Sequence, residues 1–213
     1  MPLSDAQIDR YSRQIILPEV GGRGQERLLA ARVALRGVGA MAATAARYLT
    51  GAGIGELRLS ADLAALADEL RDLNPDVTVC AGDADGSTTV VIVGDLTGSA
   101  LDGCARQARA LRVPTVAAAR RGRGGWLHVA TAADDCAGCA ARTAALHGAD
   151  ADGPLDDAAA GVLGSLLALA GMERALGRAH GGAPLAWFDA ATSMLTALPV
   201  TRFADCDACA PRA

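Results

Sequence analysis

Two Cys-x-x-Cys pairs are the residues of this chain whose type and spacing are best suited to chemistry. Cys136 and Cys139 form one pair, and Cys206 and Cys209 form the other, near the C-terminus. Each pair can direct two thiolates at one ion, so two pairs supply the four sulfurs of a closed tetrahedral zinc site. Two disulfides in an oxidising compartment, or a redox-active pair, are the alternatives. The presence of two spaced pairs favours a structural Zn²⁺ bound by all four cysteines.

A glycine-rich turn is the second candidate for chemistry. A predicted strand at 32–36 leads into a Gly-x-Gly-x-x-Ala segment at 37–42 and then into a predicted helix at 43–50. In that context the first glycine forms the turn, the second lets the backbone approach a phosphate, and the small third residue lets the helix pack on the strand. The helix start then favours an anion, although the small residues could also serve packing alone. The predicted nucleotide-binding residues of this turn are Gly37, Gly39, Ala40 and Met41.

An acidic residue that holds the ribose hydroxyls is expected after the second strand of such a fold. The second strand is predicted at 57–59, and Asp62 follows it closely enough to be that residue. The alternative is that Asp62 only caps the next helix.

The remaining pattern places these candidates in an α/β fold. Strands that alternate with helices indicate a Rossmann-like, mostly parallel sheet with helices on both faces, followed by a C-terminal zinc-tied extension. A long helix predicted at 158–176 packs either on the sheet or in a dimer interface. The expected parts of one domain (1–213) are an N-terminal helical arm (1–30) broken at 21–24, a nucleotide-binding half (31–124) and a zinc-tied C-terminal half (125–213).

Composition argues against several classes of function. A net charge of −4 and a pI near 5.3 argue against nucleic acid as a partner. The most apolar stretch, 158–172, is shorter than the ~20 residues that span a bilayer, so no membrane association is expected. The N-terminus lacks the pattern of a signal peptide, and the chain is predicted to be cytoplasmic. The histidines lack metal or triad spacing and are predicted to lie on the surface.

A series of motifs runs in order along nearly the whole chain. It begins with Arg-Tyr-Ser-Arg-Gln-Ile within 9–17 and includes the glycine turn and both cysteine pairs. Its other segments are 24–28, 113–116, 161–166 and 188–190. Together these motifs resemble the ThiF/MoeB/HesA family, the bacterial relatives of ubiquitin-activating enzymes. The resemblance implies a Rossmann-like fold, a structural zinc, a dimer, and ATP-dependent adenylation of the C-terminal glycine of a ubiquitin-like sulfur carrier.

The family's ATP site implies residues that this sequence lacks. A lysine contacts the ATP phosphates in the family, but this chain contains no lysine. The Asp-x-Asp and Asn-Leu-x-Arg-Gln elements expected after the second strand are missing as well. The nearest counterpart of the family's magnesium-binding aspartate is Asp95, which is one position away and could equally be a turn residue. The segment 143–160 holds no cysteine, whereas some members carry a catalytic cysteine there.

One cationic element of the family pattern is retained. Arg13 corresponds to the arginine that, in the family, reaches across the dimer into the partner's nucleotide site. A surface salt bridge is the alternative role for Arg13.

Three functional hypotheses follow. In the first, the chain is a noncatalytic or assisting subunit that pairs with an active homologue or binds a ubiquitin-like sulfur carrier, as a homodimer or heterodimer. In the second, it is a minimal adenylyltransferase that binds ATP and Mg²⁺ through Asp62 and Asp95, with Arg13 supplied by the neighbouring subunit. In the third, it is a Rossmann-type nucleotide or metabolite binding module. The missing motifs favour the first hypothesis.

Overall fold

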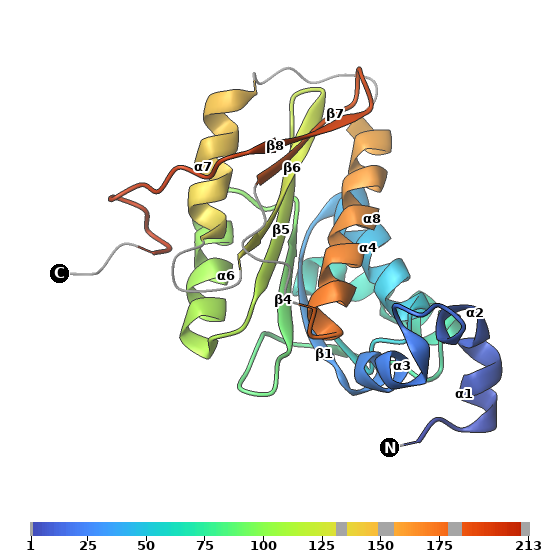
Figure 1. Cartoon of the computed structure of the whole chain (residues 1–213). Helices are drawn as coiled ribbons and strands as arrows, with labels where there is room; N and C mark the ends of the chain where they lie inside the picture. Colours follow the sequence, from blue (N-terminus) through green and yellow to red (C-terminus); the bar gives the residue numbers. More distant parts are fainter. Residues whose placement is uncertain (1, 131–135, 149–155, 179–184, 210–213) are drawn as a thin grey trace.

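An 8-stranded sheet with helices on both faces forms the centre of the molecule (Figure 1). The computed structural model describes residues 2–130, 136–148, 156–178 and 185–209. The strand order is β3-β2-β1-β4-β5-β6-β7-β8, in which the pairs from β3 to β5 are parallel and those from β5 to β8 are antiparallel. The prediction of a mostly parallel sheet covered on both faces is therefore confirmed.

The elements alternate along the chain as a doubly wound fold requires. The strands are β1 (Arg32–Gly37), β2 (Glu56–Leu59), β3 (Thr78–Ala81), β4 (Val90–Gly94), β5 (Thr115–Arg121), β6 (Gly124–Ala130), β7 (Leu185–Asp189) and β8 (Met194–Leu198). The helices are α1 (Asp5–Arg10), α2 (Ser12–Ile15), α3 (Gly21–Ala30), α4 (Gly39–Gly51), the 3₁₀ helix η1 (Ala61–Leu66), α5 (Ala67–Leu73), α6 (Gly98–Leu111), α7 (Ala137–His147) and α8 (Asp156–Ala175).

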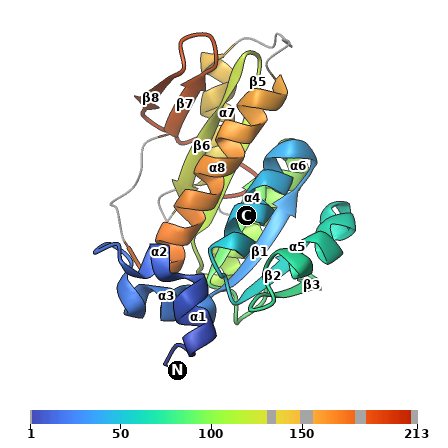
Figure 2. The same ribbon diagram turned by 90° about the vertical axis from the view of Figure 1, so that its right-hand side faces the viewer.

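Helices α4 and α8 pack against each other and cover one face of the sheet (Figures 1 and 2). Gly164 makes the close approach possible, because a Cβ there would lie 2.8 Å from the Thr44 Cβ of α4. Leu163 and Leu167 of α8 are fully buried in the core of this face. The sequence stretch 158–172 was expected to be too short to span a bilayer. In the structure, residues 157–175 of α8 are long and apolar enough to do so by length and composition alone, and 44% of the most apolar part of this helix is buried in the fold.

Helices α6 and α7 cover the other face, over a core built largely of alanine (Figure 1). Helix α7 begins directly after Cys136, so that it includes Cys139, and it was not predicted from the sequence. On this face of β6, His128 is only 1% exposed, so the prediction that it lies on the surface was wrong. His147 is exposed, as predicted, and its ring centre lies 5.0 Å from that of Trp187 in a T-shaped arrangement. His180 lies outside the described residues.

The N-terminal arm, α1 to α3, lies at the end of the sheet where β1 begins (Figures 1 and 2). The predicted break at 21–24 was wrong, because α3 starts at Gly21 in a backbone conformation that glycine tolerates, with φ of 61°. Tyr11 is 1% exposed, whereas Ile8 and Ile16 remain 46% and 76% exposed. A single aromatic side chain therefore anchors the start of the arm.

The Tyr11 ring packs where only a glycine leaves room. A Cβ at Gly53, just past the end of α4, would lie 2.6 Å from the ring. The Nδ2 atom of Asn74 donates a 2.9 Å hydrogen bond to the Tyr11 hydroxyl, which donates in turn to Asp76 Oδ2 at 3.1 Å. Asn74 Nδ2 also donates to the carbonyl of Thr50 at 2.8 Å. Burial raises the pKa of Tyr11 to about 12, so its hydroxyl remains a donor at neutral pH.

Removal of this hydroxyl should loosen the arm. We expect Tyr11→Phe to lower the free energy of unfolding by about 1–3 kcal/mol, because the buried Asn74 loses a partner. Urea unfolding followed by circular dichroism measures the change. Tyr48→Phe is the control, since Tyr48 is 56% exposed and should change stability by less than about 0.5 kcal/mol. Equal effects of the two substitutions would contradict this assignment.

Candidate functional site: a cysteine cluster and a glycine turn

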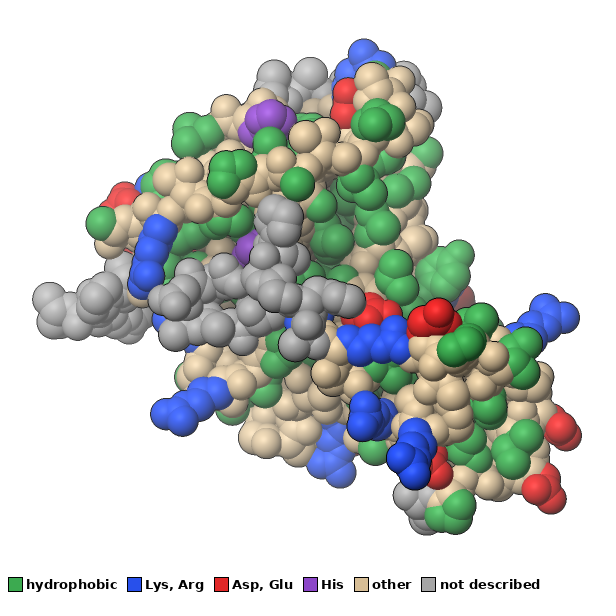
Figure 3. Space-filling view, in the orientation of Figure 1, with side chains coloured by type: hydrophobic (Ala, Val, Ile, Leu, Met, Phe, Trp, Pro, Cys, Tyr) green, Lys and Arg blue, Asp and Glu red, His purple; other side chains and the backbone are tan. Residues whose placement is uncertain are grey.

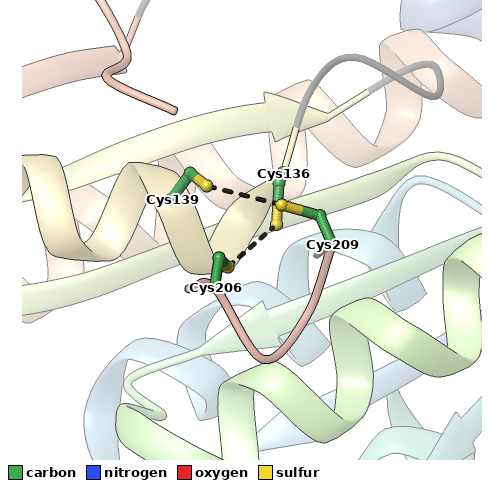
Figure 4. A group of neighbouring side chains, drawn as sticks. All are labelled: Cys136, Cys139, Cys206 and Cys209. Atoms are coloured by element: carbon green, nitrogen blue, oxygen red, sulfur yellow. Dashed lines mark hydrogen bonds between the residues drawn. The ribbon is translucent and has the colours of Figure 1, made fainter. Parts of the chain in front are cut away.

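The four predicted metal ligands lie together on the α7 side of the sheet (Figure 4). Their Sγ atoms all lie within 4.8 Å of one another, with 3.8 Å between Cys136 and Cys206 and 3.6 Å between Cys139 and Cys209. Tetrahedral coordination with Zn–S bonds of ~2.3 Å places sulfurs about 3.8 Å apart, whereas a disulfide needs about 2.05 Å. The four cysteines could therefore hold a metal ion, and their spacing does not fit two disulfides.

The start of α7 and a turn of the C-terminal segment place the four cysteine sulfurs close together. Cys136 is the N-cap of α7, and Cys139 lies in the first turn of that helix. Cys206 and Cys209 lie in a turn of the C-terminal segment, where the Cys209 N–H donates to the Cys206 carbonyl at 3.2 Å. Burial raises the pKa of Cys136 and of Cys209, which keeps both protonated without a cation. A bound dication would displace these protons and balance the thiolate charge.

Further side chains hold the C-terminal segment against α7. Arg142 Nη1 lies 3.0 Å from Asp205 Oδ1, and the guanidinium carbon lies 4.2 Å from the centre of the Phe203 ring. Thr143 Oγ1 accepts a 2.9 Å hydrogen bond from the backbone N–H of Thr201. Sequence reasoning missed these residues, because no spacing rule links an α7 side chain to a distant loop. They position the second cysteine pair beside the first.

The predicted glycine turn joins β1 to α4. Gly37 pairs in register with Gly94 at the end of β4, and the Val38 N–H donates to the Gly94 carbonyl at 3.2 Å. A Cβ at Gly37 would overlap that carbonyl, whereas at Gly39 nothing lies within 4 Å of the Cβ position. The side chain of Met41 is buried in the core, so only its backbone could contact a ligand. No side chain caps the start of α4, so the first-turn amides remain available to an anion.

The ends of β1, β2 and β4 meet at the edge of the sheet where the turn lies, the position at which parallel sheets bind ligands. Ser60 directly follows β2 and is 8% exposed, and among the described residues its Oγ has no hydrogen-bond partner. Asp62 lies two residues further, exposed, in the first turn of η1. Sequence reasoning singled out Asp62 and passed over Ser60, because a hydroxyl that lacks a partner is visible only in three dimensions.

Asp95 follows β4 beside the turn, but its carboxylate is already engaged. Its oxygens accept hydrogen bonds from the backbone N–H of Arg120 at 3.0 Å and from the Arg120 Nε at 2.7 Å. Arg120 lies on β5, which extends beyond the end of β4. The prediction of Asp95 as a nucleotide-site residue remains a prediction, and its partner Arg120 was not predicted.

Arg13 lies far from the glycine turn of its own chain. It is exposed on α2, two residues after Tyr11, which packs at Gly53 just past the end of α4. The glycine turn lies at the opposite end of this 13-residue helix, a separation of roughly 20 Å. Among the described residues Arg13 has no hydrogen-bond or ion-pair partner, so the predicted alternative of a salt bridge gains no support.

The residues of the turn fit a nucleotide phosphate better than they fit a bound magnesium ion. The space at Gly39, the uncapped amides of α4 and the unpartnered hydroxyl of Ser60 suit an anion and a polyol. Mg²⁺ needs carboxylate oxygens that are free to coordinate it, and those of Asp95 are taken by Arg120. If ATP bound at this site, it would supply a ribose and a polyphosphate whose α-phosphorus can be transferred with pyrophosphate as the leaving group.

The sequence of this region matches a known family. Residues 11–63 match the model of the ThiF family. Over 57 residues the chain is 51% identical to the SAMP-activating enzyme E1 of Haloferax volcanii. This matched stretch covers 27% of this chain and 21% of that protein. It is 48% identical over 58 residues to the adenylyltransferase and sulfurtransferase uba4 of Pyricularia oryzae, covering 27% and 12% of the two chains. The match therefore spans about a fifth or less of these relatives.

The fold has solved counterparts over nearly its whole length. The crystal structure of PaaA superposes with a TM-score of 0.72 at 16% identity, covering 93% of this chain and 84% of PaaA. The structure of E. coli MccB with ATP gives a TM-score of 0.69 at 14% identity, covering 94% and 74%. At these identities the likeness concerns the fold. The chain thus matches the ThiF family model over residues 11–63, and its fold is similar to those of PaaA and E. coli MccB.

Proposed function

We propose that this chain is an assisting, noncatalytic subunit in the activation of a ubiquitin-like sulfur-carrier protein, paired with an active homologue. The observation that carries the proposal is the separation between Arg13 and the glycine turn of the same chain. Arg13 lies on α2, two residues after Tyr11, which packs at Gly53 just past the end of α4, whereas the glycine turn lies at the start of α4. Arg13 therefore suits the site of a partner subunit better than the site of its own chain.

The chemistry of adenylation supports an assisting role. That reaction holds the carboxylate in line with the α-phosphorus while cations neutralise the developing charge. The chain has no lysine, and Asp95 is occupied by Arg120. A cation at a transferred phosphoryl group is worth ~10³–10⁵ in rate, so the loss of several such groups should abolish turnover within one subunit.

Two apolar surfaces are available for partner proteins. Val162 and Leu169 of α8 are 42% and 52% exposed, and Figure 3 shows hydrophobic side chains over this helix. Strand β8 is an edge strand of the sheet and contains no charged residue. Its Met194 and Leu195 are 60% and 50% exposed. Uncharged edge strands tend to pair with another strand. We assign α8 to the partner subunit and β8 to the carrier.

The cysteine cluster supplies the structural part of the proposal. We infer that it binds one Zn²⁺, since four sulfurs at tetrahedral spacing with three of the residues buried make a closed site. The ion would fasten the C-terminal segment, which follows β8, to α7 and so hold the end of the carrier surface in place.

Arg13 is expected to act on the partner's site. In an assembly of this chain with an active ThiF-family homologue and its carrier, Arg13→Ala should lower ATP–pyrophosphate exchange by at least about 100-fold. Arg13 is exposed, so the free energy of unfolding should stay within about 0.5 kcal/mol. Arg23→Ala is the matched control, because it removes the same charge from an exposed position on α3. Equal exchange rates for the two variants would contradict the assisting role of Arg13.

A further inference from the structure

Strand β8 has no strand on its outer side among the described residues, and it lies at the opposite end of the sheet from β3 (Figure 2). Residues 194–197 are all exposed, and their side chains alternate between the two faces of the strand. Met194 on one face and Leu195 on the other are both at least half exposed. Apolar side chains are therefore open to solvent on both faces of a strand whose edge is also free.

The hydrogen-bond pattern determines which main-chain groups of β8 face outward. The Ala190 N–H, just after β7, donates to the Arg123 carbonyl, just before β6, at 3.0 Å. Bonded and non-bonded pairs alternate along an antiparallel ladder, so every second residue of β7 counted back from Ala190 faces β6, and the others face β8. Those others pair with residues 194, 196 and 198 of β8. The N–H and C=O groups of Leu195 and Ala197 therefore point away from the sheet.

The edge formed by β3 is blocked in a way that the edge formed by β8 is not. The N–H groups of Thr78 and Gly82 donate to carbonyls at the two ends of β2, so by the alternation of the ladder Val79 faces outward. Arg71 Nη2 of α5 donates to the Val79 carbonyl at 3.0 Å, which lays a charged side chain across that edge. Charged side chains of this kind protect edge strands from pairing. Strand β8 contains no charged residue, so its edge lacks this protection.

An extended polypeptide segment is the ligand that such an edge accepts, because only another strand offers main-chain donors and acceptors at the same two-residue spacing. The lack of charge on β8 and the exposure of Met194 and Leu195 favour a segment with uncharged, apolar side chains. The strand is only five residues long, whereas a stable interface between two copies needs at least ~1,000 Å². Pairing at β8 therefore suits a partner that binds transiently better than it suits a second copy of this chain.

We propose that β8 binds an extended, uncharged segment of the ubiquitin-like carrier as a ninth strand of the sheet, through the outward N–H and C=O groups of Leu195 and Ala197. This inference rests on the proposed function, which assigns β8 to the carrier, and it adds how the carrier is recognised. Recognition is by main-chain hydrogen bonds, so it depends on an open strand edge rather than on a particular side chain. It involves no covalent step.

Amide hydrogen exchange of the isotope-labelled full chain, followed by NMR with and without each ubiquitin-like carrier of the source organism, tests the inference. In the free chain the amides of Leu195 and Ala197 should exchange faster than those of Thr196 and Leu198, which face β7. A bound carrier should slow exchange at Leu195 and Ala197 by at least about tenfold. The outward amide of Val79 on the opposite edge strand is the internal control and should be unaffected.

Ala197→Pro removes one outward donor and leaves the ladder with β7 intact, because proline is tolerated on an edge strand whose N–H faces solvent. It should weaken carrier binding, measured by calorimetry, by at least about tenfold, since the incoming strand loses a hydrogen bond and meets the proline ring. Ala197→Val is the matched control, because it keeps the N–H and should change the affinity by no more than about threefold. A thermal melt of each variant checks that the fold is retained.

Carrier binding that leaves exchange at Leu195 and Ala197 unchanged would overturn the inference, as would equal affinities of the two Ala197 variants. Protection of these amides that grows with the concentration of the free chain would show that a second copy occupies the edge, which also overturns it. So would the absence of binding by every carrier. None of these results refutes the assisting role, which depends on pyrophosphate exchange in the mixed assembly and on Arg13. Conversely, failure of the Arg13 experiment would leave strand pairing at β8 to be judged by amide exchange.

Discussion

Replacement of Cys206 by alanine should remove the bound metal and release the C-terminal segment from α7. The three remaining sulfurs cannot close a tetrahedral site, and structural zinc contributes ~10–16 kcal/mol of binding free energy in small zinc-finger peptides. Even a fraction of that is comparable to the ~5–15 kcal/mol stability of a whole domain. We expect zinc content to fall from about one per chain to near zero, and the thermal transition to drop by about 10 °C or more.

Elemental analysis and calorimetric melting measure these effects together. Cys80→Ser is the matched control, because Cys80 lies on β3, outside the cysteine cluster, and is half-buried. It should retain zinc and change the melting temperature by only a few degrees. A native chain purified without zinc, or a Cys206→Ala variant as stable as the Cys80→Ser control, would contradict the metal assignment.

Gly37→Ala should be among the most damaging single-methyl changes in the chain. The new Cβ would overlap the Gly94 carbonyl and lie 2.8 Å from the Ala42 Cβ, and the φ of 156° lies outside the range that alanine prefers. The overlap is with backbone on the neighbouring strand, so no side-chain rotation relieves it. We expect a loss of about 4 kcal/mol or more, or failure to fold.

Gly39→Ala provides the contrast for this prediction. Its Cβ would meet nothing within 4 Å, and only its φ of 65° opposes alanine, so the expected cost is about 1–2 kcal/mol. Urea unfolding of both variants, read by circular dichroism, measures the difference. Similar stabilities would show that the close approach of β1 and β4 does not depend on Gly37.

The sequence was most informative where chemistry fixes a spacing. The cysteine pairs predicted a cluster because four sulfurs must surround one ion, and the Sγ atoms do converge. The strand–turn–helix pattern placed Gly37 and Gly39 in the turn correctly, since both have a positive φ that favours glycine and Gly37 also leaves no room for a Cβ. Alternation of apolar strands and helices predicted the parallel part of the sheet.

Features that depend on tertiary contacts were not predictable. The contact between Arg120 and Asp95 requires β5 to extend past the end of β4, and no local pattern reports strand overhang. His128 is buried because β6 is an interior strand covered by α7. Glycine propensity predicted a break at 21–24, but α3 begins there, because packing outweighs local propensity.

The central claim, that this chain assists rather than catalyses, is tested most directly by ATP–pyrophosphate exchange with the purified chain alone. The assay would contain zinc-loaded protein, MgATP, radiolabelled pyrophosphate and each ubiquitin-like carrier of the source organism in turn. We predict no exchange above background with any carrier, and exchange when an active ThiF-family homologue is added. Carrier-dependent exchange by the chain alone, at rates of order 1 s⁻¹ or more, would show that it is a complete adenylyltransferase and would contradict the account.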